Sequence, residues 1–193
     1  MKRTRLLFFA VLAVLLGLLV YFFFKDASSE RILPKTARPA PAASAESAGP
    51  GGTRTVSVFF LREADGLLVP ELRTIPASDQ VAREAETLLG ELIKGSEHGY
   101  VSTIPAGTKV WQVFVTKDGT AYADFSRELV TAHPSGTEAE TATVYAIVNS
   151  LAINFRTIKK VFILVDGEER ETLNGHIMLD KPFVPNYSLT AQS

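Results

Sequence analysis

The feature that most constrains this chain is an uninterrupted apolar run near its N-terminus, residues 6–24, which reads LLFFAVLAVLLGLLVYFFF. Its 19 residues carry no charge, and as a helix rising about 1.5 Å per residue they would cover roughly 28 Å, close to the thickness of a bilayer's hydrocarbon core. Basic side chains precede the run: Lys2, Arg3 and Arg5. The two charges that follow it, on Lys25 and Asp26, cancel. The positive-inside rule therefore predicts a cytoplasmic tip and transmembrane signal-anchor over residues 1–25, with the remainder of the chain outside the cytoplasm.

A cleaved signal peptide is the alternative for this segment, because the small residues Ala27, Ser28 and Ser29 offer a cleavage position. The run is longer than the apolar core of a usual signal peptide, which favours a retained anchor. Residues 26–53 follow and are rich in Ala, Ser, Pro and Gly. A segment of this composition cannot bury a core, so we expect a disordered tether. A flexible tether of 28 residues would have a root-mean-square span of about 30 Å.

Composition excludes several classes of site. The chain contains no cysteine, which rules out a lipidated cysteine, disulfides, thiolate metal sites and cysteine nucleophiles. From Arg54 onward, 13 Lys and Arg face 18 Asp and Glu, a net charge of about minus five. An acidic domain without clusters of basic residues along its sequence argues against binding to nucleic acid and against direct docking on anionic lipid headgroups.

Residues 54–188 carry the alternation and helical spacing of one folded domain, followed by a short tail at residues 189–193. The first half of the domain is expected to contain a hairpin over residues 55–62 and 67–75, and then a helix capped by Ser78 and ended by Gly95. A second hairpin is expected over residues 109–116 and 120–125, followed by a helix that a capping box at residues 135–138 opens. An apolar strand over residues 160–165 and an extended piece over about residues 175–183 complete the domain. This order predicts an α+β domain in which two helices pack on a mostly antiparallel sheet. Simple alternation puts Trp111 on the core side of its strand together with Val113 and Val115.

The stretch STIPAGTKV, residues 102–110, has the residues of a possible ligand loop. A phosphate loop needs several glycines that follow a strand and lead into a helix, whereas Gly107 here leads into a strand. A turn fits better, because Pro105 fixes its own φ and Gly107 accepts a positive φ. We therefore expect a turn, with Lys109 as a solvated residue at the start of the strand.

Titratable residues do not form a recognisable site in the sequence. The histidines His98, His133 and His176 lack metal-binding spacing. His176, which Asp166 and Asp180 flank in sequence, could be a base, but a hydrogen-bonded loop histidine is the simpler interpretation. An acidic turn could attract Ca²⁺, but it lacks the spacing of an EF-hand loop and is expected to be solvated. Its members are Asp166, Glu168, Glu169 and Glu171. We predict no catalytic residue, no metal site and no cofactor.

The order and spacing of several segments resemble the GerMN domain, a module of sporulation and spore germination proteins. The matching segments are VSVFF, AETLLGELIKG, STIPAGTKV, DGTAYADFS, VYAIVNSLAINF, VFILVDG and LNGHIMLDKPF, which together cover about residues 55–185. The resemblance implies an α+β fold similar to the ring-building motifs of secretion-system and sporulation-channel proteins. It also implies a role in assembly or scaffolding and supplies no catalytic residue. This chain has one copy of the module.

Three functions are consistent with these features. The first is a non-enzymatic envelope protein whose domain binds another envelope protein or itself through sheet edges and helix faces. The second is a module that binds cell-wall peptidoglycan by aromatic stacking, with Trp111, Tyr122, Tyr100 and Tyr187 as the possible contacts. The third, a hydrolytic or metal-dependent enzyme, has the least support.

Overall fold

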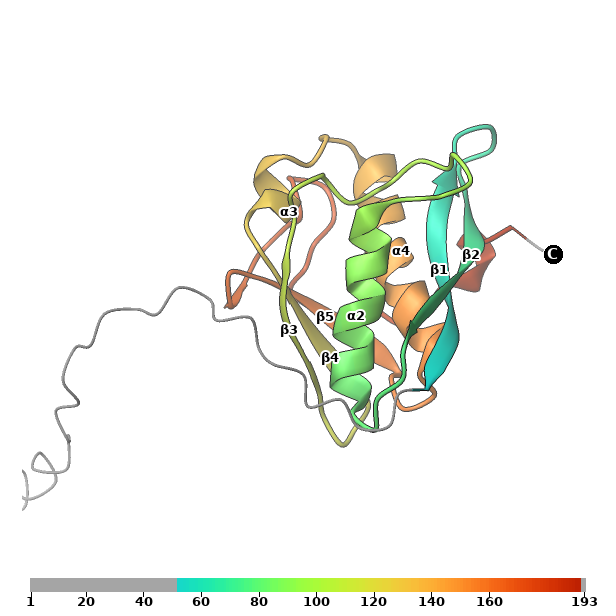
Figure 1. Cartoon of the computed structure of the whole chain (residues 1–193). Coiled ribbons are helices and arrows are strands. Elements are labelled where there is room, and N and C mark those ends of the chain that lie inside the picture. The colour runs from blue at the N-terminus through green and yellow to red at the C-terminus, as the bar shows by residue number, and fades with distance from the viewer. Residues whose placement is uncertain (1–51, 192–193) are drawn as a thin grey trace, which may run out of the picture. The chain divides into compact units, whose positions relative to one another are not determined.

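A computed structural model describes residues 52–191 (Figure 1). The predicted anchor and nearly all of the predicted tether lie outside the described residues. Within residues 52–191 no helix has the length and apolar character needed to cross a membrane. The elements in chain order are β1 (Thr53–Arg62), β2 (Leu67–Pro76), α2 (Val81–Lys94), β3 (Val110–Val115), β4 (Thr120–Phe125), α3 (Glu128–Thr131), α4 (Thr137–Asn154), β5 (Lys160–Val165), β6 (Glu168–Glu169) and the 3₁₀ helix η2 (Tyr187–Leu189).

The predicted α+β class is confirmed, with one difference in how the strands are grouped. The strands form two sheets, the hairpin β1-β2 and a four-stranded sheet in the order β3-β4-β5-β6. Every pair is antiparallel except β4 and β5, which are parallel because α3 and α4 carry the chain back to the starting end of the sheet. The expected extended piece at residues 175–183 forms no strand and makes only the isolated bridges Val161 to Phe183 and Thr172 to Met178.

The helix α2 supplies the core between the two sheets, as its apolar spacing predicts. Ala85, Leu88, Leu89 and Leu92 are buried, and α2 packs on β1, β2 and β3. Gly95 ends the helix with a φ of 92°, a conformation that glycine adopts without strain.

The predicted Ser78 cap is wrong, because the N-cap residue is Gln80 and no side chain caps the helix. The Ser78 hydroxyl instead accepts the Gln80 N–H in the turn before α2.

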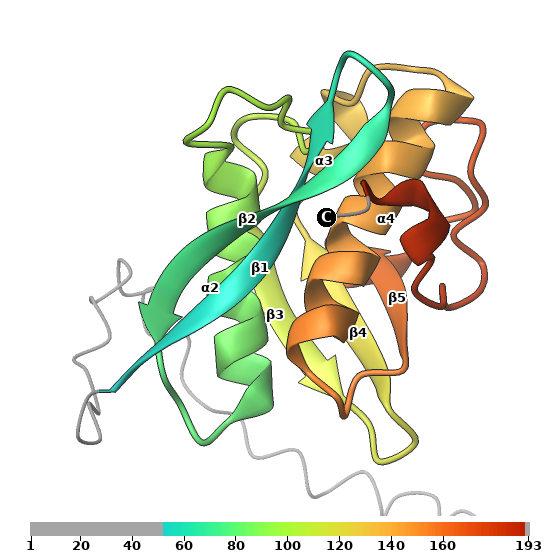
Figure 2. The ribbon, with the colours of Figure 1, turned by 90° about the vertical axis from the view of Figure 1, so that its right-hand side faces the viewer.

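The helix α4 separates the two sheets by hydrogen-bonding to the edge of β1. The Ser150 hydroxyl accepts the Phe59 N–H at 3.0 Å. The Asn154 side chain accepts the Ser57 N–H at 3.0 Å and donates to the Ser57 carbonyl at 2.7 Å. These polar side chains occupy the place of a neighbouring strand, so β1 cannot join the larger sheet. Figure 2 shows α4 beside the hairpin.

The predicted capping box at the start of α4 is also wrong. Gly136 is the N-cap residue and no side chain bonds there. Glu140, one turn into the helix, is completely buried and bonds to a distant loop instead of to its own helix end.

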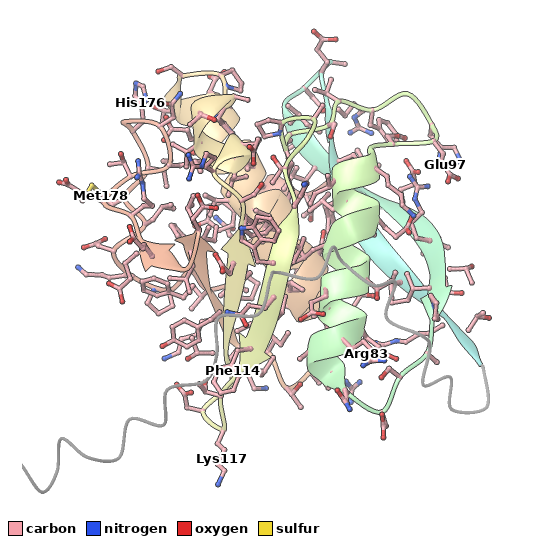
Figure 3. All side chains as sticks on the ribbon, turned by 60° about the vertical axis from the view of Figure 1, so that its left-hand side comes forward. Arg83, Glu97, Phe114, Lys117, His176 and Met178 are labelled. Carbon is pink, nitrogen blue, oxygen red and sulfur yellow. The ribbon has the colours of Figure 1, made fainter. Side chains whose placement is uncertain are left out.

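The long axis of α2 runs from one end of the domain to the other. The β3–β4 turn marks one end, where Figure 3 labels Phe114 and Lys117, with Arg83 of α2 nearby. Glu97 and His176 lie toward the opposite end in the same view. The length of α2, 14 residues, corresponds to about 21 Å between these ends.

Candidate functional site

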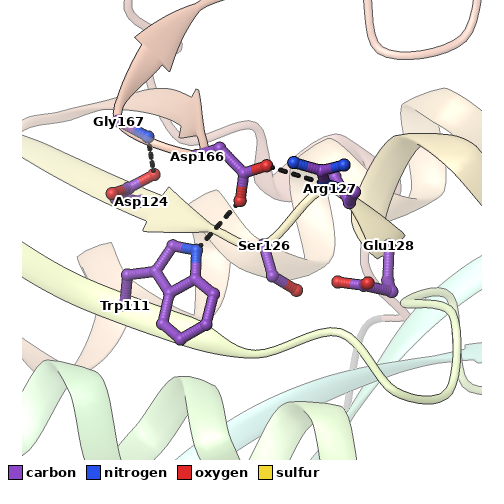
Figure 4. Close-up of a pocket in the computed structure, with 7 residues that line it drawn as sticks. All are labelled: Trp111, Asp124, Ser126, Arg127, Glu128, Asp166 and Gly167. Carbon is purple, nitrogen blue, oxygen red and sulfur yellow. Dashed lines mark hydrogen bonds and ion pairs between the residues drawn. The ribbon is translucent and has the colours of Figure 1, made fainter. Parts of the chain in front are cut away.

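A cavity of about 470 Å³ opens where the parallel strands β4 and β5 end. The segments that follow the two strands bring polar side chains together there, as the carboxyl ends of neighbouring parallel strands commonly do. The residues that line the cavity are Trp111, Asp124, Ser126, Arg127, Glu128, Asp166 and Gly167 (Figure 4).

A β-bulge brings Trp111 to this cavity. The register of β3 on β4 shifts between Val110 and Gln112, so that simple alternation fails across Trp111. The expected core position is therefore wrong, and Trp111 is 53% exposed while Val113 remains buried. The Lys109 ammonium lies 5.8 Å from the centre of the indole ring, within the range of a cation–π contact.

Asp166 organises the rim of the cavity. It accepts the indole N–H of Trp111 at 3.1 Å and the Nε–H of Arg127 at 3.0 Å. These donors hold the pKa of the Asp166 carboxyl below its usual value. The backbone of Asp166 has a φ of 52° and that of Gly167 a φ of 78°, which suits the tight turn joining β5 to β6. The buried carboxylate of Asp124 fixes this turn by accepting the Gly167 N–H at 2.8 Å.

The floor of the cavity is polar as well. The buried Ser126 hydroxyl accepts the Lys109 N–H at 2.9 Å, and it lowers the pKa of Glu128. An exposed indole surrounded by carboxylates, a hydroxyl and a guanidinium can stack on an apolar ring face while it hydrogen-bonds to polar substituents at the ring edge. Sequence reasoning named Trp111 and Asp166 separately, but their contact depends on a bulge and on long-range pairing.

The other proposed stacking residues do not join Trp111 around this cavity. Tyr122 is half-buried and stacks on Phe162 with ring centres 5.5 Å apart. Tyr187 is exposed in η2, and Tyr100 packs against the core in the loop after α2. None of the three lines the cavity.

The stretch 102–110 forms the predicted turn. Thr108 donates both its backbone N–H and its hydroxyl to the Pro105 carbonyl, and Gly107 has a φ of 88°. The stretch also lines a second cavity of about 380 Å³, walled mainly by apolar residues that include Leu61, Ile93 and Ile104. No local sequence pattern marks this cavity, because its walls come from several separate segments.

The histidines are held as structural side chains. His133 is buried, with Nε2 at 2.7 Å from the Thr143 hydroxyl and Nδ1 at 2.7 Å from the Pro134 carbonyl. His176 pairs through Nδ1 with Glu140 at 2.8 Å and with neither Asp166 nor Asp180.

His98, on the surface, lies 3.2 Å from a Glu71 carboxylate oxygen. Glu168 and Glu169 of the acidic turn are exposed. Among residues 52–191 no group of three or more His, Asp or Glu side chains is placed to share a metal ion.

Comparison with known proteins gives consistent matches over this domain. A family described as "Germane: Sporulation and spore germination" matches residues 57–171. The chain is 31% identical over 114 residues to the spore germination protein GerM of Bacillus subtilis, a match that covers 58% of this chain and 30% of that protein. The chain thus spans less than a third of that relative's length.

Solved structures agree on the fold. The first GerMN domain of Bacillus subtilis GerM superposes with a TM-score of 0.56 at 25% identity, covering 68% of this chain and 97% of that one. The tandem GerMN domains of the same protein give a TM-score of 0.54 at 24% identity, covering 69% of this chain and 46% of that structure.

Proposed function

Because the chain belongs to the Germane family of sporulation and spore germination domains, we propose that it is a non-enzymatic assembly module of the cell envelope. In this proposal residues 6–24 anchor it in the membrane, the domain lies outside the cytoplasm, and the domain binds a second copy or another envelope protein. The observation that carries the proposal is the open edge of β2.

The edge of β2 follows from the pairing register. Ser57, Phe59 and Leu61 of β1 direct their backbone groups away from β2, toward α4 and Val101. Their partners on β2 are Leu72, Pro70 and Leu68. In an antiparallel pair, two residues that face each other without hydrogen-bonding both direct their backbone N–H and C=O groups away from the partner strand. The outward backbone groups of β2 therefore belong to Leu68, Pro70, Leu72 and Thr74.

Part of this edge is already blocked and part is open. The Leu68 carbonyl accepts the Ala191 N–H at 2.9 Å, and Pro70 has no N–H to offer. Within residues 52–191, the outward N–H and C=O groups of Leu72 and Thr74 have no hydrogen-bond partner. The Leu72 side chain is 69% exposed. An open strand edge beside an exposed leucine is suited to pairing with a strand of another chain.

The test is the assembly state of the full chain in membranes. Mass photometry and chemical crosslinking should detect an oligomer or a copurifying envelope protein. Leu72→Lys places a charge on the open edge and should weaken that assembly. Val184→Lys, at a residue that is 63% exposed elsewhere on the domain, should not. A strict monomer with no copurifying partner would rule out the proposal.

A second candidate function, binding to peptidoglycan, is favoured by the exposed indole over the polar cavity. Glycans present both apolar ring faces and hydroxyls, which Trp111 and the surrounding Asp166, Arg127 and Glu128 could contact together. Purified peptidoglycan should then retain the chain, and Trp111→Ala should abolish the retention. Phe114→Ala, which removes a more exposed aromatic side chain outside the cavity, is the matched control. Peptidoglycan that retains none of the wild-type chain would eliminate this candidate.

A further inference from the structure

The fold gathers basic side chains from two separate loops at the end of the domain marked by the β3–β4 turn. The backbone N–H groups of Lys159 and Lys160 donate to the Gly119 carbonyl at 2.7 and 3.3 Å, which joins the α4–β5 loop to this turn. Lys117 at the tip, with Arg156 and Lys159, is exposed, and Lys160 is half-buried. We call Lys117, Arg156, Lys159 and Lys160 the basic end. Arg156, Lys159 and Lys160 stand together in the sequence, whereas Lys117 lies about 40 positions before them. Only the fold brings Lys117 beside the other three.

The described chain also begins at this end. Arg54, in the second position of β1, places its guanidinium 4.8 Å from the centre of the Phe155 ring and donates to the Asn154 carbonyl. Phe155 immediately precedes Arg156 of the basic end. Figures 1 and 2 both show the start of β1 at the same end as the β3–β4 turn and the α4–β5 loop. A membrane anchor N-terminal to residue 52 would therefore connect to the domain at the basic end.

The charge at the basic end is largely unopposed. Asp118, the one acid of the two loops, pairs with Lys160 at 3.3 Å. The hydroxyls of Thr116 and Thr120, and then this ammonium, keep the pKa of Asp118 low. Within residues 52–191, Lys117, Arg156 and Lys159 form no ion pair. At the same end of α2, Glu84 pairs with Arg54, and Glu86 accepts the Val113 N–H at 2.9 Å. Arg83 of the same turn balances the charge of Glu86.

Screening separates the basic end from the acidic remainder of the domain. The two ends are about 21 Å apart along α2, which is more than two Debye lengths of about 8 Å at physiological salt. The carboxylates at the far end of the domain, such as Glu97, therefore do little to the potential at the basic end. A net charge summed over the sequence hides this polarity.

An exposed aromatic side chain lies beside the basic end. Phe114 is 62% exposed, and Figure 3 shows it close to Lys117. Its partner across the strands is Tyr122, which is held by its stack on Phe162, so that Phe114 projects from a firm surface. An exposed aromatic residue next to lysines is typical of proteins that rest on the headgroup region of a membrane.

We propose that the basic end and Phe114 dock the domain on an anionic lipid surface. The end of the domain at which β1 starts then faces the membrane. The inference depends on the proposed membrane anchor for keeping the domain near a bilayer. It leaves the β2 edge and the Trp111 cavity to other partners. It also reverses the expectation from net charge that the domain avoids anionic lipid.

The first test measures binding of a fragment that starts at Gly52 to lipid vesicles. This fragment is expected to fold alone, since the buried core runs from Val56 to Leu179 and a single GerMN domain has been solved by itself. It should cosediment with vesicles of mixed phosphatidylglycerol and phosphatidylcholine and not with phosphatidylcholine alone. The double variant Lys117→Gln/Lys159→Gln should bind about thirty-fold more weakly, since each basic residue near a membrane contributes about fivefold.

The matched control is Lys94→Gln/Arg170→Gln, which removes the same charge away from the basic end. It should bind like the wild type. Equal losses in the two double variants, or equal binding to both kinds of vesicle, would overturn the proposal, because the attraction would then be non-specific.

The second test uses the full chain and keeps this inference separate from the proposed function. Because the chain has no cysteine, Phe114→Cys and Met178→Cys each accept a single environment-sensitive dye. Met178 is exposed and lies outside both the β2 edge and the basic end. In anionic bilayers the dye at position 114 should report an apolar environment and the dye at position 178 an aqueous one.

An aqueous signal at position 114 in a chain that pellets with membranes would overturn the docking and leave the anchor and the assembly proposal intact. If the full chain does not pellet with membranes, the proposed anchor is refuted instead. Vesicle binding by the fragment would still test the basic end. Full displacement of the fragment by a soluble polyphosphate, with position 114 still aqueous, would assign the basic end to a polyanion and also overturn the proposal.

Discussion

Replacing Glu140 by glutamine removes a buried charge that holds the loop between Leu173 and Met178 on α4. The Glu140 side chain is completely buried. One carboxylate oxygen accepts the backbone N–H groups of His176 at 3.1 Å and Ile177 at 2.8 Å, and the other lies 2.8 Å from His176 Nδ1. Glutamine keeps the shape of the side chain but offers one acceptor oxygen and no charge.

The expected loss of stability follows from the pKa of Glu140. Burial alone would raise this pKa, but the hydrogen bonds from Ile177 and His176 outweigh burial and lower it from 4.5 to about 2. A shift of that size corresponds to about 3 kcal/mol at 1.36 kcal/mol per pKa unit. His176 is 42% exposed and its share of the interaction is screened by water, so we expect Glu140→Gln to lower the free energy of unfolding by about 2 kcal/mol at neutral pH.

The same pKa fixes the pH dependence. Because the pKa of Glu140 is lower in the folded than in the unfolded chain, its contribution is fully present above about pH 4.5 and is lost as the pH falls toward about 2. Glu71 has its pKa lowered to about 2 as well, so the wild type loses stability in this window through at least two carboxylates. The Glu140→Gln variant should lose less over the same window.

Urea unfolding followed by circular dichroism, at neutral and at acid pH, measures both effects. His176→Ala is the matched control, because it removes only the half-exposed partner and should cost less than about 1 kcal/mol. If Glu140→Gln stays within about 0.5 kcal/mol of the wild type at neutral pH and keeps the same acid slope, the reasoning on this buried carboxylate is refuted.

Three further substitutions test the fold by the same urea titration. Trp111→Ala should change the free energy of unfolding by less than about 1 kcal/mol, because the ring is half exposed. A loss of about 3–5 kcal/mol would mean that Trp111 is buried in the core after all. Gly119→Ala should cost about 2–3 kcal/mol, because φ is +87° and the new Cβ would lie 2.7 Å from Lys159 Cγ; a neutral result would mean that the turn joins the α4–β5 loop differently. Ser150→Ala should cost about 1–3 kcal/mol by leaving the buried Phe59 N–H unpaired, and no loss would argue against α4 as the partner of the β1 edge.

Patterns confined to neighbouring residues predicted most of the secondary structure. The dipeptides Asp65-Gly66 and Asp118-Gly119, which favour tight turns, lie between the strands of the two hairpins. The spacing of Leu88, Leu89 and Leu92 predicts the buried face of α2. These signals are local, because strand alternation and helical periodicity depend on the backbone alone. Local reasoning failed at the helix starts. Ser78 and the expected capping box do not cap the helices, whose N-cap residues are Gln80 and Gly136.

Features that depend on contacts between distant segments could not be predicted in this way. One extra residue in β3 turned Trp111 from the core to the cavity, and a bulge has no clear mark in a single sequence. Glu140 reached His176 across 36 positions. The basic end needed the β3–β4 turn and the α4–β5 loop to meet at Gly119. Of the residues that line the candidate site, sequence reasoning therefore named Trp111 and Asp166 separately, without their contact or the polar residues around them.

The predicted tether sets how strong the proposed membrane docking must be. A domain held on 28 residues with a reach of about 30 Å meets the adjacent surface at an effective concentration in the millimolar range. Docking is then half occupied at a dissociation constant of about 1 mM, or about 4 kcal/mol. Three unpaired basic residues at about 1 kcal/mol each, with some burial of Phe114, reach that value. High salt shortens the Debye length to about 3 Å at 1 M and should release the domain while the proposed anchor keeps the chain in the membrane. Docking of this strength can therefore orient the domain and still be reversed by a partner that competes for it.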